Sequence, residues 1–217
     1  MLSRSARPRS RAQLTGLILA AAAATAATAA LPASPALAAG HHAPARSTHH
    51  SRRLVRSGST SAACADANLV PTPTNRARIA TATLCLINQQ RAAADLAPLR
   101  SDAALGAAAA QHSADMVAND YFDHVSPSGS TPKSRLTAVG YIKPNHAWTI
   151  GENIAAATGS LATPASIVKM WMNSPGHRAN ILNAAFRDTG IAAAAAAPAL
   201  VGAGPGGTYT EDFGARS

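Results

Sequence analysis

Apolar side chains recur at helical spacing in two long segments of the chain. The first, 75–95, combines this spacing with strong helix formers and ends before Leu96-Ala97-Pro98. The second, 102–119, begins at Asp102, a residue type suited to an N-cap. Its apolar positions form one continuous stripe of Leu105, Ala109, His112 and Met116. The pattern predicts two amphipathic helices, and we expect His112 to be a core histidine.

Three Ser/Thr-Pro pairs indicate where shorter helices begin, because proline is favoured at the first helical position. Thr131-Pro132 opens a segment that ends at Gly140, and Thr163-Pro164 opens one that runs to Met172. Ser174-Pro175 opens a brief helical turn that carries His177. We therefore expect three short helices after the two long ones.

Three segments near the C-terminus have the features of strands. Residues 148–155 alternate, with Ile150, Glu152 and Ile154 on one face. Residues 208–213 are a second candidate, and 190–197 is a third because the glycines around it suit a hairpin. Helices followed by strands that pair antiparallel predict an α+β layered domain.

The first 38 residues have the three parts of a secretory signal peptide. Four arginines precede an apolar stretch over 17–31, and the small-residue site Ala36-Leu37-Ala38 follows. The stretch is mostly alanine and threonine and ends at Pro32, which disfavours a membrane anchor. We expect cleavage near Ala38 and a secreted protein, extracellular or associated with the cell wall. No later stretch is apolar enough for a transmembrane anchor.

The charge of the chain is concentrated in its N-terminal part. The formal charge is +9, but eight of the 19 Lys and Arg residues precede residue 61, which leaves 11 against 10 acidic residues. A domain with a net charge of +1 is a poor nucleic-acid binder. Residues 39–60 lack the apolar side chains that a fold needs, so we expect a disordered basic linker that could touch anionic wall polymers. Residues 61–217 are then one domain, which we expect to be a monomer.

The chain contains two cysteines, Cys64 and Cys85. In an oxidising compartment an even pair is expected to be bridged. The disulfide would tie an irregular N-terminal strap to the first helix and contribute about 3 kcal/mol by the loop-entropy estimate.

Three segments carry candidate chemistry: 121–124 (YFDH), 151–155 (GENIA) and 174–182 (SPGHRANIL). An ionised Glu152 on an apolar strand face requires a cation or donor beside it. Together with 86–91 (LINQQR) and 209–214 (YTEDFG), these segments resemble the CAP superfamily of cysteine-rich secretory, antigen 5 and pathogenesis-related 1 proteins, in its bacterial secreted form.

The resemblance implies a three-layer α-β-α sandwich with a small antiparallel sheet. It also implies a cleft of two histidines and acidic residues that binds a divalent cation in some members. By position, His124, Glu152 and His177 match the cleft, and Asn153 lies beside it. The second acidic residue of many relatives has no counterpart, and Ser174 is the closest replacement.

Two imidazoles and a carboxylate form a ligand set that suits zinc, and also copper or nickel. A hydrogen-bonded network of Glu152, His124 and His177 without metal is the alternative. We expect a binding module of the cell envelope or extracellular space, with a wall polymer, a small polar ligand or a lipid as partner. A metal-assisted hydrolase and a lipid- or sterol-binding module remain open. No nucleophile-elbow pattern supports a serine hydrolase.

Overall fold

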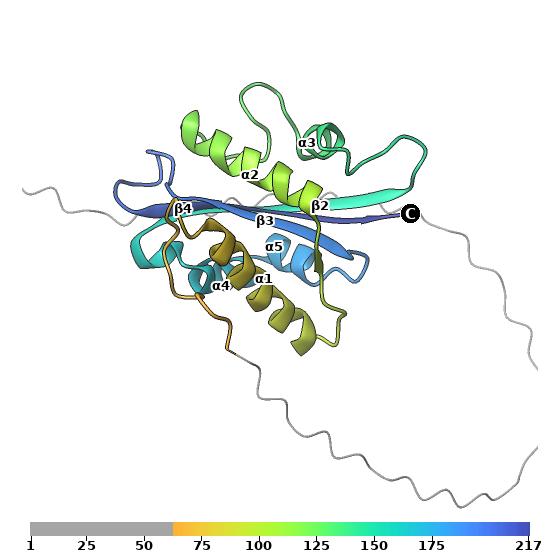
Figure 1. Cartoon of the computed structure of the whole chain (residues 1–217), viewed down its shortest axis with the longest axis horizontal. Helices are drawn as coiled ribbons and strands as arrows, with labels where there is room; N and C mark the ends of the chain where they lie inside the picture. The colour runs from red at the N-terminus through yellow and green to blue at the C-terminus, as the bar shows by residue number, and fades with distance from the viewer. Residues whose placement is uncertain (1–62) are drawn as a thin grey trace, which may run out of the picture. The chain divides into compact units, whose positions relative to one another are not determined.

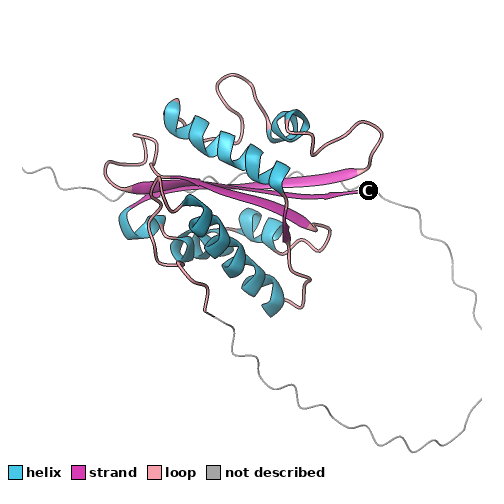
Figure 2. Ribbon diagram, viewed as in Figure 1, coloured by secondary structure: helices cyan, strands magenta, loops and turns pink. Residues whose placement is uncertain are grey.

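The computed structural model describes residues 63–217. The expected signal peptide (1–38) and linker (39–60) lie outside the described residues and stay predictions, as does a domain boundary at residue 61. The described part is a four-stranded sheet between two layers of helices (Figures 1 and 2).

The sheet is built around a long antiparallel pair of strands. β2 (Trp148–Thr158) pairs with β4 (Gly206–Arg216) over the whole 11-residue length of both. β3 (Asp188–Ala194) pairs antiparallel with the other side of β4, and β1 (Arg100–Ser101) adds a short parallel pair beyond β3. The order is therefore β1-β3-β4-β2. β1 pairs parallel with β3, whereas an antiparallel sheet was expected. A strand of two residues leaves no periodic signal in the sequence, so it could not be foreseen.

Helices cover both faces of this sheet, as expected for an α-β-α sandwich (Figure 1). On one face lie α2 (Ala103–Ala118) and α3 (Pro132–Ala138). On the other lie α1 (Arg76–Ala93), α4 (Pro164–Asn173) and α5 (Pro175–Ile181), and the 3-10 turn η1 (Gly159–Ala162) precedes α4.

The helix starts follow the local sequence. Asp102 accepts hydrogen bonds from the backbone N–H groups of Ala104 and Leu105. Thr131 accepts one from Ser134 N, whose hydroxyl in turn accepts one from Thr131 N. Each cap satisfies backbone donors that a helix leaves unpaired at its first turn. Pro132, Pro164 and Pro175 each stand at the start of a helix.

Apolar residues fill both interfaces between the sheet and the helices. The larger cluster lies under α1, α4 and α5 and includes Ile79, Ile87, Trp171 and Phe213. The indole of Trp171 also donates a hydrogen bond to Ile154 O at 3.1 Å, so its only polar atom is satisfied. The smaller cluster lies under α2 and α3 and contains Leu105, Leu136 and Tyr141.

Gly190 allows α2 to lie directly against the sheet. A Cβ on Gly190 would lie 2.0 Å from the backbone nitrogen of Gly106 and 2.5 Å from the Cβ of Leu105. No side chain fits at this distance, so the approach of α2 to β3 requires glycine. His112, on the same helix, is buried.

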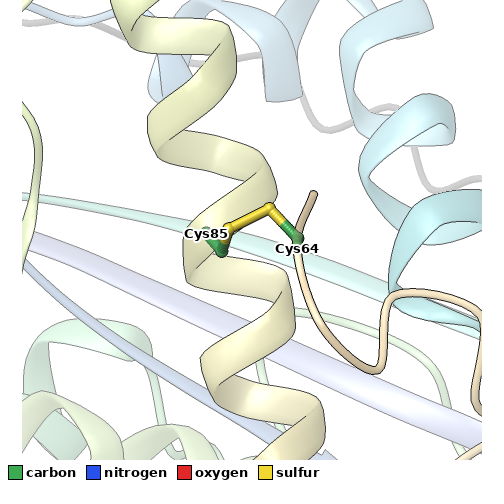
Figure 3. Close-up of a disulfide and its surroundings, with 2 residues drawn as sticks. All are labelled: Cys64 and Cys85. Carbon is green, nitrogen blue, oxygen red and sulfur yellow. A yellow bond between two sulfur atoms is a disulfide. The ribbon is translucent and has the colours of Figure 1, made fainter. Parts of the chain in front are cut away.

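The expected disulfide between Cys64 and Cys85 is present (Figure 3). It joins the segment before α1 to the middle of α1, with Cα atoms 5.8 Å apart. The Nε of Arg78, also on α1, donates to Asp66 at 2.8 Å, so an ion pair holds the same segment.

Replacing both cysteines with serine should lower the free energy of unfolding by about 2 kcal/mol while the fold persists. This is below the loop-entropy figure because the reduced denatured chain retains residual structure. Denaturant unfolding monitored by circular dichroism measures the difference. Two reactive thiols in the native wild-type protein, or equal stability of the two proteins, would contradict the expectation.

Candidate functional site

Glu152 lies at the centre of a buried group of charged and polar side chains. Strand β2 directs it toward the α2 and α3 layer, and its side chain is 2% exposed. Burial alone would raise its pKa, but the hydrogen bond from His124 and the charges of Arg135 and His112 outweigh that effect and hold the pKa below its usual value. Glu152 is therefore an ionised carboxylate in an interior position.

Arg135, on α3, supplies the cation that the sequence required near this carboxylate. Its Nη2 donates to Glu152 Oε2 at 2.6 Å and to the carbonyl oxygen of His124 at 3.0 Å. Its Nη1 donates to Ser130 O at 3.1 Å. One buried guanidinium thus fixes both the carboxylate and the loop that carries His124. Arg135 was not among the residues predicted for the site.

His124 is oriented by the other oxygen of Glu152. Its Nδ1 lies 2.7 Å from Glu152 Oε1, and because an ionised carboxylate only accepts, Nδ1 carries the proton. With the proton on Nδ1, a neutral form of the ring presents its lone pair at Nε2. This Nε2 is buried and has no hydrogen-bond partner among the described residues.

His177, on α5, presents a second imidazole. The residue is buried, and neither of its ring nitrogens has a hydrogen-bond partner within residues 63–217. Burial, with the nearby charge of His124, lowers its pKa to about 4. The ring is therefore neutral at pH 7 and available as a nitrogen donor or acceptor.

Ser174 and Asn153 were also predicted for the site, and both are buried. Ser174 lies buried at the junction of α4 and α5, and its carbonyl accepts the Arg178 N–H at 2.9 Å. Asn153 faces the opposite side of β2 from Glu152 and donates to the His177 carbonyl at 3.2 Å. It also accepts from Asn180 at 2.9 Å. Asn153 thus positions the helix that carries His177.

Two further residues join the site without having been predicted there. His112 is buried as expected, but its Nε2 lies 3.8 Å from Glu152 Oε1 and so faces the site. Asp212, on β4, is directly opposite Glu152 in the ladder. Burial, with the negative charge of Glu152, raises the pKa of Asp212 well above its usual value. A second carboxyl group therefore lies beside Glu152, but it comes from β4. The position shortly after Trp171, where many relatives carry their second acid, is Ser174 here.

The residue before it, Glu211, is buried on the other face of the sheet. It lies opposite Asn153 in the ladder and accepts a hydrogen bond from Thr189 at 3.3 Å. Burial raises its pKa well above the usual value. Glu211 is therefore a second protonated acid beneath the site, adjoining the asparagine that holds α5.

The donor atoms of this site partly fit a metal ion. Both oxygens of Glu152 are already paired, with His124 and Arg135, so this carboxylate suits an orienting role rather than direct ligation. The free nitrogens of His124 and His177 suit a transition metal. Among residues 63–217, no three His, Cys, Asp or Glu side chains are grouped as a metal-binding set. Metal binding stays a prediction.

The chain matches a known protein family over the part that carries this site. Residues 84–200, more than half of the chain, match the cysteine-rich secretory protein (CAP) family. The chain belongs to this family. The match covers α2, α3, β2, α4, α5 and β3, which carry His112, His124, Arg135, Glu152 and His177.

Two curated Bacillus subtilis proteins are similar to the central part of this CAP protein. The uncharacterized protein YkwD is 41% identical over 106 residues, which are 49% of this chain and 38% of YkwD. The uncharacterized membrane protein YlbC is 38% identical over 108 residues, which are 50% of this chain and 29% of YlbC. The match therefore spans well under half of each relative.

A solved structure supports the same assignment. It is that of an extracellular protein containing an SCP domain from Bacillus anthracis, with a TM-score of 0.51 and 30% sequence identity. The similarity covers 66% of this chain and 43% of the other. Within residues 63–217, none of the helices has the length and apolar character to cross a membrane.

Proposed function

We propose that this CAP protein is an extracellular binding module whose cleft holds a divalent transition metal between the imidazoles of His124 and His177. The observation that carries the proposal is the set of nitrogens without partners in a buried site. Buried polar atoms nearly always find a hydrogen-bond partner in a folded protein. Four imidazole nitrogens have none among residues 63–217: one of His112, one of His124 and both of His177. They point to a ligand that supplies the missing contacts.

The lowered pKa of His177 and the orientation of His124 both favour metal binding. Metal ligands must be deprotonated, and the lowered pKa of His177 keeps its ring neutral at pH 7. Glu152 fixes the ring of His124 through Nδ1, the arrangement in which a carboxylate orients a metal-binding imidazole. A bound cation would act as a Lewis acid that attracts an oxygen of a polar ligand.

Three observations support an extracellular location. The N-terminus has the pattern of a secretory signal peptide. The disulfide requires an oxidising compartment to persist. The similar solved domain from Bacillus anthracis belongs to a protein described as extracellular.

A metal-assisted hydrolase is the second candidate, and Asp212 is the observation that favours it. The raised pKa of Asp212 leaves a buried proton beside the ionised Glu152. Such a pair of carboxyl groups with different protonation states suits general acid and base chemistry. The lipid-binding alternative gains no comparable support, because the side chains named for this site are charged or polar.

Zinc titration of the purified protein by calorimetry tests the proposal. The linker residues His41, His42, His49 and His50 are first replaced with alanine, so that they do not bind the metal themselves. We expect one zinc per chain, about 100-fold weaker binding for His124→Ala or His177→Ala, and about tenfold for Glu152→Gln, since orienting groups typically contribute 10–100-fold.

His146→Ala is the matched control, because this exposed histidine lies outside the cleft. Absence of binding at micromolar zinc, or equal affinity in the His124 and His177 variants, would refute the metal site. The zinc-loaded protein is then assayed on peptide, ester and wall-glycan substrates. Turnover that is lost in Asp212→Asn would replace the binding module with the hydrolase.

A further inference from the structure

A second concave site lies where β2 begins and β4 ends, away from the histidine cleft. It has a volume of about 340 Å³. Its lining residues are Tyr141, Lys143, His146, Trp148, Arg216 and Ser217. The lining contains no aliphatic and no acidic side chain.

The indole of Trp148 is the main apolar surface of this pocket. It is 38% exposed, whereas the other tryptophan, Trp171, is fully buried in the core. The ammonium group of Lys133, on α3, lies 5.4 Å from the centroid of the Trp148 ring. An exposed indole fixed by a cation–π contact is a rigid platform on which a ligand ring can pack.

Positive charge surrounds this platform. Lys133 and Lys143 form no ion pair with any carboxylate among residues 63–217. The guanidinium of Arg216 lies 4.3 Å from the Tyr141 ring centroid and is paired with Asp102 at 3.2 Å. The Tyr141 hydroxyl also donates to Asp188 at 3.3 Å, and Asp188 is paired with Arg100 at 3.2 Å. Four cations thus stand near two carboxylates, on a domain whose overall charge is close to neutral. The site favours an anion.

The composition of the pocket restricts the chemistry of that anion. An acyl chain would find no aliphatic side chain to contact. A nucleic acid requires a longer basic surface and several stacking rings. A sugar ring has an apolar C–H face that suits one indole and hydroxyl groups that suit the surrounding donors. Lysine and arginine recognise carboxylate and phosphate groups.

We propose that this pocket binds an acidic saccharide, with the sugar ring on Trp148 and its carboxylate or phosphate group at Lys143 and Arg216. Trp148 and Glu152 lie on the same face of β2, four residues or about 13 Å apart. A longer saccharide would therefore extend along β2 toward His124, an extension that rests on the proposed function.

Nuclear magnetic resonance titration of the purified protein with trigalacturonate, and separately with glucose 6-phosphate, tests the proposal. The two indole N–H signals make the experiment specific, since Trp171 serves as an internal reference. We expect the Trp148 signal to shift with at least one of the two sugars, and the relative affinities identify the acidic group. Trp148→Ala and Lys143→Glu should each weaken binding about tenfold, and Trp148→Phe less.

Lys169→Ala is the matched control, because Lys169 is an exposed lysine on α4. Its affinity should stay within twofold of the wild type. Neither sugar shifting Trp148 would overturn the proposal, as would equal binding of the methyl ester of trigalacturonate. So would equally tight binding of tetraglutamate or of a thymidine tetranucleotide. The His124→Ala/His177→Ala protein should bind glucose 6-phosphate unchanged, which separates this pocket from the metal proposal.

Discussion

Replacing Arg135 with methionine should lower the free energy of unfolding by about 3–5 kcal/mol. The reason is that Glu152 would remain ionised and buried without its cation, and an uncompensated buried charge costs this much. The carbonyl oxygens of His124 and Ser130 would lose their guanidinium donor as well. Within the described part of the chain, the other ion-pair partners of Glu152 are His112 and His124, which lack a permanent charge.

Urea unfolding at pH 7 measures this loss, and a double variant assigns its cause. Adding Glu152→Gln to Arg135→Met should recover a substantial part of the stability, since the stranded charge is removed. Arg178→Met is the control, because this arginine is exposed on α5, and it should change stability by less than about 0.5 kcal/mol. An Arg135→Met protein as stable as the wild type would show that Glu152 does not depend on this cation.

The helices were predictable because their ends have strong local signals. The pattern over 75–95 corresponds to α1 at Arg76–Ala93, and each Ser/Thr-Pro pair begins a helix where expected. The alanine-rich β3 was harder, because alanine itself favours helix. The glycines on either side of the alanine run favoured a strand. The structure adds that α2 leaves no room for a Cβ at Gly190. The short β1 is set by tertiary pairing alone and has no signature of its own.

The sequence predicted which kinds of side chain the site needs, but not every residue that supplies them. An ionised Glu152 on an apolar face requires a cation. The sequence does not say which of the 11 Lys and Arg residues from residue 61 onward supplies it. Asp212 depends on the register of β2 against β4, which the alternation of side chains does not fix. One signal was available: adjacent acids within the expected strand 208–213 must point to opposite faces, and helices cover both.

The low pKa of His177 predicts a specific dependence of stability on pH. In the folded protein the pKa is about 4, whereas an imidazole in the unfolded chain has a pKa of about 6.5. Between these values the unfolded chain binds a proton that the folded protein does not. The stability contribution is therefore complete above pH 6.5 and is lost as the pH falls toward 4. From pH 8 to pH 4 the wild type should lose about 3 kcal/mol through this group.

Comparison with His177→Gln isolates that contribution. His112 also has a lowered pKa and adds a loss of the same sign, whereas the raised pKa values of Glu211 and Asp212 oppose it. Because these groups titrate in both proteins, the difference in unfolding free energy between wild type and variant should change by about 3 kcal/mol over this range. The measurements are made with a chelator, since a bound metal would itself stabilise the neutral ring. Parallel profiles for wild type and His177→Gln would mean that the second imidazole is protonated as readily in the fold as in the open chain. A metal would then compete with protons for His177 below about pH 6.5, as it does at any free imidazole.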